Sequence, residues 1–324
     1  MRRWIAGRTA QAAVTIVVAA VLMFFLMRVT PGDPLARLMG DRPMSAEEVA
    51  ALRALYGLDQ PIPRQFARFV SGLARGELGV SIEYRIPVTT LIRQRLPASL
   101  LLGGTVLVLN FTIGIWLGAL QAVRLGGRLD RWLSTLSLAA FAMPSFWLGL
   151  ILAWLVGIRW HLLPALGMID PLLPPDTGIV VRSLDILRHL ILPALTLSIV
   201  SIAATMRYQR TAMIDALREP YIRTARAKGL SERRVIWRHA WRTALFPVIT
   251  LFGLWLPIVV TGSVFVEHVF NWPGLGSLTA KAISGRDYPV IMGATLLAAA
   301  LVVGGGWLTD MAYAWLDPRV RHAA

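Results

Sequence analysis

Six hydrophobic runs without a single charged side chain recur along this sequence, separated by polar segments of unequal length. The runs are Thr9–Met27, Ala98–Val123, Trp132–Ile158, Leu190–Met206, Thr243–Val266 and Tyr288–Thr309. A helix needs about 20 residues, and at least about 17, to cross a bilayer's hydrocarbon core. A backbone in lipid must also satisfy its own hydrogen bonds, which favours helices. The pattern predicts an all-α membrane protein with six transmembrane helices; the alternative is that one or two runs are buried helices of a soluble core.

The charge of the chain is divided unevenly between the two sides that these helices would define. The sequence holds 33 Lys and Arg against 18 Asp and Glu, a net charge of +15. If the N-terminus is cytoplasmic, the inner segments (1–8, 124–131, 207–242 and 310–324) carry 18 basic and 6 acidic residues, and the longer outer segments carry 15 and 12. This positive-inside bias predicts a bacterial inner-membrane protein with both termini in the cytoplasm. The excess favours anionic lipid rather than nucleic acid as a partner.

The first run follows a basic N-terminus and could be the core of a signal peptide. It is longer than a usual signal core, and the segment 28–31 lacks a small-residue cleavage site, so we expect a retained anchor. We divide the chain into an N-terminal part (1–96), a core with five runs (97–314) and a short cytoplasmic tail (315–324). The absence of cysteine from the sequence excludes disulfides and thiolate metal ligands.

The outer segment 30–96 contains helix patterns of its own. A capping box predicts a helix over 45–56 that Gly57 ends. Two further helices are expected over 63–76 and 88–96. The apolar sides of these helices must be buried against something. They could pack on the membrane helices or form a docking surface for another protein, and both roles can occur at once.

The cytoplasmic segment 207–242 contains the most informative local pattern. Pro220 suits the first turn of a helix that continues to Lys228, and Gly229 is a natural left-handed residue behind it. Ser231 can then cap a second helix. The pattern predicts a short helix, a sharp corner and a second helix that project from the membrane. The alternative is a solvated basic loop that serves only topology.

The corner, 221–230 together with 238–240, resembles the cytoplasmic coupling motif of permeases from binding-protein-dependent ABC importers. The closest subtype is the first permease of the dipeptide, oligopeptide and nickel family, with the usual Glu-Ala-Ala replaced by Arg223-Thr224-Ala225. That departure puts in doubt any contact assigned to a glutamate. Further motifs of the subtype occur in order: Pro31-Gly32-Asp33-Pro34, Tyr56-Gly57-Leu58-Asp59-Gln60-Pro61, Gly76-Glu77-Leu78-Gly79-Val80-Ser81, Val266-Glu267, Pro273-Gly274-Leu275-Gly276 and Leu316-Asp317-Pro318-Arg319.

The resemblance implies a type I ABC importer permease fold with an extracytoplasmic helical insert after the first transmembrane helix. It implies a second six-span permease, two cytoplasmic ATPase subunits and an extracytoplasmic solute-binding protein as partners, and dipeptides or oligopeptides as substrates, with glutathione-like peptides and chelated nickel still open. ATP would be used by the partners, because this chain lacks a glycine-rich loop ending in Gly-Lys-Ser/Thr and should bind no cofactor. The residues implied in ATPase coupling are Tyr221, Thr224, Ala225, Ala227, Gly229, Leu230 and His239.

Four residues near or within the runs are candidates for the pathway or its gate. Asn110 is the most polar residue in the middle of a run, where it could form a helix–helix hydrogen bond or line the pathway. Glu267 lies at the end of the fifth run, where water or a headgroup could reach it, and Pro273 and Gly274 follow in an outer loop. Prolines inside the third and fifth runs should kink or start helices.

Two other classes of function have less support. A secondary transporter would need ionisable residues deep in its spans, and none of the six runs contains a carboxylate or a histidine. An enzyme would need a catalytic or metal-binding constellation, and the five histidines are scattered without metal-ligand spacing. We therefore predict no catalytic residue and no metal site.

Single cysteines introduced into this cysteine-free chain can test the topology. A cysteine at Gln60 should react with an impermeant maleimide in intact cells, because the charge bias places it outside. A cysteine at Gly229 should react only after the membrane is opened. Labelling of position 229 from outside intact cells would contradict the predicted orientation.

Overall fold

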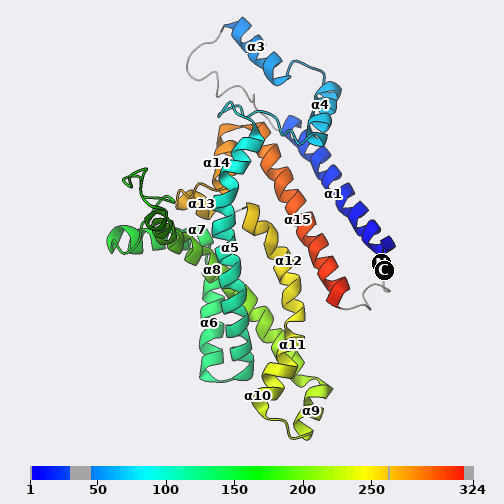
Figure 1. Ribbon diagram of the computed structural model, residues 1–324, viewed down its shortest axis with the longest axis vertical. Coiled ribbons are helices and arrows are strands. Elements are labelled where there is room, and N and C mark those ends of the chain that lie inside the picture. Colours follow the sequence, from blue (N-terminus) through cyan, green and yellow to red (C-terminus); the bar gives the residue numbers. More distant parts are fainter. Residues whose placement is uncertain (1, 30–44, 262, 317–324) are drawn as a thin grey trace.

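The computed structural model describes residues 2–29, 45–261 and 263–316, most of which lie in helices (Figure 1). The elements are α1 (Arg2–Val29), α3 (Ala46–Tyr56), α4 (Ile62–Ala74), α5 (Val88–Val123), α6 (Arg128–Ala142), α7 (Ser145–Leu152), the π-helical η1 (Ala153–Arg159), α8 (Ile179–Arg218), α9 (Pro220–Ala227), α10 (Glu232–Arg234), the π-helical η2 (Val235–Ala240), α11 (Trp241–Ala244), α12 (Phe246–Thr261), α13 (Val264–Val269), α14 (Leu275–Gly285) and α15 (Tyr288–Leu316). The turn motif at 31–34 and most of the tail 315–324 lie outside the described residues. The bundle is elongated, with α3 and α4 at one end and α9 and α10 at the other (Figure 1).

Four described helices, α1, α5, α8 and α15, are long and apolar enough to cross a membrane. The third predicted run is not one straight span, because α6 and the α7–η1 helix meet at 98° around Pro144, which caps α7. Proline cannot donate to the preceding turn, so the chain changes direction there. If this bent pair is one span, the described helices give up to five. The fifth predicted run is divided among several elements, of which α12 has only 16 residues.

The predicted outer helices form, with one exception. α3 has the predicted capping box between Ser45 and Glu48, and Gly57 ends it at a φ of 66°. α4 corresponds to the second predicted helix. The third, over 88–96, is wrong as a separate helix, because these residues form the first turns of α5, which continues through Pro97. Buried residues on both sides of that proline hold the helix together, so the predicted boundary at 96 falls inside one element.

The outer segment packs on the membrane helices, which is one of its two expected roles. Phe66 and Phe69 of α4 lie against Phe24 of α1, with ring centroids 5.2 and 5.4 Å apart. Just before α15, the buried carboxylate of Asp287 accepts hydrogen bonds from the Ser81 hydroxyl and from the backbone N–H of Ile82. These contacts fix the chain between α4 and α5 on the start of α15.

α5 and α8 share the most extensive interface between any two helices in the described part of the chain. An added Cβ at Gly114 would lie 3.0 Å from the side chain of Thr205, and one at Gly118 would lie 2.4 Å from the carbonyl oxygen of Met206. Glycine at these positions therefore lets the two backbones approach closely, as small residues do between membrane helices.

A Gly118→Ala substitution should separate α5 from α8 and lower the free energy of unfolding by about 1–3 kcal/mol, the usual cost of overpacking. Gly104→Ala is the matched control, because Gly104 is also in α5 and an added Cβ there meets nothing within 4 Å. Both substitutions raise the helix propensity by the same amount, so the difference between the two variants in the free energy of unfolding measures the cost of the steric clash. Equal unfolding midpoints for the two variants in a denaturing-detergent titration would show that the close approach is not needed.

Candidate functional site

The predicted short helix and sharp corner around Gly229 both form. α9 begins at Pro220, and Gly229 follows it with a φ of 73°, in the left-handed region that glycine adopts without strain. Ser231 then occupies the N-cap position of α10, as predicted, but its side chain makes no capping hydrogen bond. The corner lies at the end of the molecule opposite α3 and α4 (Figure 1).

A hydrophobic cluster joins this corner to the membrane helices. Ile222 and Ala225 of α9 are buried against residues from α5, from the last turns of α8, and from η2 and α11. Because Met213 and Ala216 of α8 belong to the same cluster, the last turns of α8 and the corner share one core. The complete set of its buried residues is Ala119, Ala122, Met213, Ala216, Ile222, Ala225, Val235, Ile236, Ala240 and Ala244.

The residues implied in ATPase coupling lie on two different faces. Thr224, Ala227 and Gly229 are exposed on the surface of the corner, where another protein can reach them. Tyr221 is also exposed, but its hydroxyl donates to the Thr243 hydroxyl of α11 at 2.8 Å. Ala225 points the other way and is buried within this chain. Leu230 packs against the same cluster, and His239 is half-buried in η2. The sequence pattern did not separate these faces.

An ion pair closes the corner. Nε and Nη2 of Arg226 donate to the two carboxylate oxygens of Glu232 at 3.1 and 2.6 Å, so the last turn of α9 is tied to the first turn of α10. The hydrogen bond from Arg226 lowers the pKa of the Glu232 carboxyl below its usual value. Both side chains are about half exposed, so the pair orders the corner more than it stabilises the fold. No local sequence pattern indicated this pair, although the two residues flank the predicted turn.

A second ion pair supports the corner from the membrane side. The carboxylate of Asp130, at the start of α6, accepts from Nε and Nη2 of Arg210 in α8 at 2.8 and 3.0 Å. The same carboxylate accepts from the backbone N–H of Gly126 in the turn between α5 and α6. Asp130 is only 4% exposed. This bidentate geometry therefore fixes α6 and the preceding turn on α8, close to where α8 leads into α9.

The prediction that water or a headgroup could reach Glu267 is wrong, because this residue is fully buried. Its carboxylate accepts from the Ser99 hydroxyl of α5 at 3.0 Å and from the backbone N–H of Ser277 in α14 at 2.9 Å. Gly274 allows this arrangement, since an added Cβ would lie 2.4 Å from the Glu267 carboxylate. α14 folds back over the carboxylate, which explains its burial. The arrangement pins α14 onto α5.

The pathway candidates do not form one group. Glu267, Pro273 and Gly274 lie together around the start of α14, next to Trp272, whose indole donates to the Ala98 carbonyl at 2.9 Å. Asn110 lies 11 residues beyond Ser99 in α5, about 16 Å along the helix. It is buried, and among the described residues its amide has no hydrogen-bond partner.

Asp130→Asn should lower the free energy of unfolding by about 2 kcal/mol, because the charge of Arg210 loses its partner in a partly buried site. Arg210→Gln should cost a similar amount. The double variant should lose clearly less than the sum of the two single losses, since the interaction can be broken only once. Strictly additive losses in the denaturing-detergent titration would contradict this clamp.

Comparisons with known proteins cover nearly the whole chain. Residues 1–103 match a family described as "Binding-prot-dependent transport system membrane comp, N-term". Residues 110–322 match the family "Binding-protein-dependent transport system inner membrane component".

Curated relatives are similar over almost their full length. The dipeptide transport system permease protein DppB of Escherichia coli K12 is 36% identical over 337 residues, covering 99% of both chains. The di/tripeptide transport system permease protein DppB of Pseudomonas aeruginosa is 39% identical, again over 99% of each chain. The oligopeptide transport system permease protein AppB of Bacillus subtilis is 38% identical, covering 99% of this chain and 100% of its own.

Proposed function

The chain belongs to the family of binding-protein-dependent transport system inner membrane components, and we propose that it is the membrane-spanning subunit of an ATP-driven importer of dipeptides or oligopeptides. The observation that carries this proposal is the similarity, at 36–39% identity over the full length, to permeases named for dipeptide and oligopeptide transport. The cytoplasmic corner supports it independently, because it presents an ordered surface away from the spans.

The energy for transport comes from other subunits in this proposal. The sequence has no glycine-rich loop that could hold ATP phosphates. We assign ATP to two cytoplasmic ATPase subunits, half of the pathway to a second permease, and solute delivery to an extracytoplasmic binding protein. The exposed side of α9, with Tyr221, Thr224 and Ala227, is the contact surface for one ATPase.

The protein is a multi-pass inner-membrane protein, and we propose six spans with both termini in the cytoplasm. In this topology α6 and the α7–η1 helix together form the third span, and α11 and α12 together form the fifth. The helices α9 and α10 then lie on the cytoplasmic side, and α3 and α4 lie on the extracytoplasmic side. The arrangement in Figure 1 supports it, since these pairs lie at opposite ends of the bundle. The positive-inside bias sets the direction.

The corner and α8 would then move as one body. When ATP closes the ATPases, each carries the docked α9 with it, and the shared hydrophobic cluster transmits the displacement to α8 and α5. A packed bundle shifts between discrete arrangements more readily than it bends, which suits alternating access. Solute choice rests mainly with the external binding protein, so glutathione-like peptides and chelated nickel remain second to dipeptides and oligopeptides.

Gly229→Val tests the coupling role. An added Cβ at this position meets nothing within 4 Å in this chain, so the effect of the substitution within the chain comes from the left-handed backbone, at a cost of about 1–2 kcal/mol. We expect normal membrane insertion and normal association with the second permease. Uptake of a labelled dipeptide into vesicles, with ATP inside and loaded binding protein outside, should be lost, and ATP hydrolysis should fall or no longer respond to the binding protein.

Arg233→Ala, which removes a basic side chain from α10 without straining the backbone, is the control and should retain most of the uptake. Full uptake by Gly229→Val at normal expression would mean that the corner serves topology alone. Uptake by the unmodified transporter that needs neither ATP nor a binding protein would overturn the proposed function itself.

A further inference from the structure

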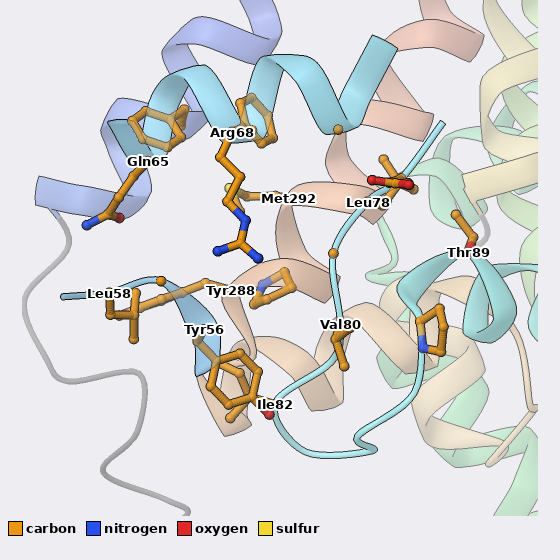
Figure 2. A pocket seen from close by; sticks show the side chains of 18 of the residues that line it. Tyr56, Leu58, Gln65, Arg68, Leu78, Val80, Ile82, Thr89, Tyr288 and Met292 are labelled. Carbon is orange, nitrogen blue, oxygen red and sulfur yellow. The ribbon is translucent and has the colours of Figure 1, made fainter. Parts of the chain in front are cut away.

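A cavity of 540 Å³ lies where the last turn of α1, α4, the segment 75–82 and the start of α15 meet (Figure 2). Its walls are mostly apolar, with Phe24, Phe69, Leu78 and Met292 among the lining residues. Sites for small ligands usually measure about 300–1,000 Å³. None of the residues assigned to ATPase coupling or to the pathway lines it, so this cavity is separate from the candidate site.

Two arginines give the cavity a positive character. Arg28, near the end of α1, is half-buried in the wall above the ring of Phe24, at 4.9 Å from its centroid, and donates to the side-chain carbonyl of Gln65. The guanidinium of Arg68 reaches down from α4 into the same space (Figure 2). Among the described residues neither arginine has an acidic partner, and the lining carboxylate, Glu77, lies 3.6 Å from Arg75 instead.

Two buried donors on this wall lack an acceptor. Tyr288 is only 6% exposed, yet its hydroxyl has no hydrogen-bond partner in the described part of the chain. The buried Nε–H of Arg28 is likewise without a partner there. Buried polar groups are almost always hydrogen-bonded, so two unpaired donors around one basic cavity call for a ligand with acceptor oxygens.

The position of the cavity selects among anionic ligands. Arg28 lies in the last turn of a helix long and apolar enough to span the membrane, which places it at the level of lipid headgroups. Phe25 of α1, which stacks on Phe66 of α4 and lies against Phe24 of the cavity wall, is 46% exposed and continues this apolar wall onto the surface of the bundle. A ligand with an anionic head and apolar chains could enter from the bilayer along this surface.

We propose that this cavity binds the phosphate head of an anionic phospholipid, with the first part of its acyl chains on the apolar wall. The Arg28 guanidinium suits a phosphate because its donors form a planar fork, and Tyr288 supplies a further hydrogen bond. The lipid bridges α1, α4 and α15, so it holds the outer helices on the bundle. Basic pockets next to membrane helices bind lipid headgroups by the same chemistry.

The test measures lipid retained by the full-length chain after detergent exchange, by native mass spectrometry, from mixed micelles of dioleoyl phosphatidylglycerol and dioleoyl phosphatidylcholine. The unmodified chain should retain phosphatidylglycerol preferentially. Arg28→Gln should retain it roughly tenfold less, the loss expected for one hydrogen bond to a charged group. Arg64→Gln is the matched control, because Arg64 lies in α4 with Arg68 but does not line the cavity, and this variant should behave as the unmodified chain.

Two variants that leave both arginines in place keep the test decisive if Arg28→Gln folds poorly. Tyr288→Phe removes only the unpaired hydroxyl and should weaken retention by a smaller factor. Met292→Trp fills the apolar part without changing charge and should also reduce retention. Equal retention by the unmodified chain, Arg28→Gln and Met292→Trp would overturn the proposal. A second result would also overturn the proposal: millimolar inorganic phosphate displaces the lipid completely, and Met292→Trp does not change lipid retention. The site would then hold free anions only.

Discussion

The close approach of α5 and α8 determines how the other helices of the bundle can pack. A glycine at position 118 leaves room for the Met206 carbonyl, and no larger residue fits without separating the two helices. With these helices in contact, Arg210 of α8 can reach Asp130 at the start of α6, and the start of α14 can close over Ser99 of α5. Apolar side chains gain little free energy by moving from lipid into a helix interface, because lipid tails are equally apolar. Close packing and paired polar groups therefore supply most of the free energy that holds membrane helices together.

The same contact links the two ends of the molecule. α8 is one helix from Ile179 to Arg218, and its last turns share a hydrophobic cluster with the corner around Gly229. At the other end, Asp287 holds the segment before α5 on α15, next to the basic cavity. In the proposed mechanism, displacements applied to the corner would be passed to α5 and α8, whereas the end with α3 and α4 is fastened to α1 and α15. This division of the bundle suits the proposed transport subunit, in which the driving force acts on the corner.

The features that were predictable from the sequence are those with local causes. The capping box at Ser45 and the corner at Gly229 depend on residues a few positions apart, and both formed. The sequence could not distinguish Pro97, through which α5 continues, from Pro144, where the chain bends, because packing by distant residues decides the outcome. The burial of Glu267 likewise depends on partners 168 positions back in α5 and 10 positions ahead in α14, which no local pattern indicates.

The proposed coupling requires that α8 and the corner move as one rigid body. The most direct measurement is the distance between spin labels at Leu187→Cys and Arg223→Cys in this otherwise cysteine-free chain, within the assembled transporter, before and after ATP is trapped. Both positions are exposed, in α8 and α9, so labels should be tolerated. Our account predicts one narrow distance distribution with the same centre in both states. A shift or a second population on ATP binding would show that the corner moves independently of α8 and would contradict the account.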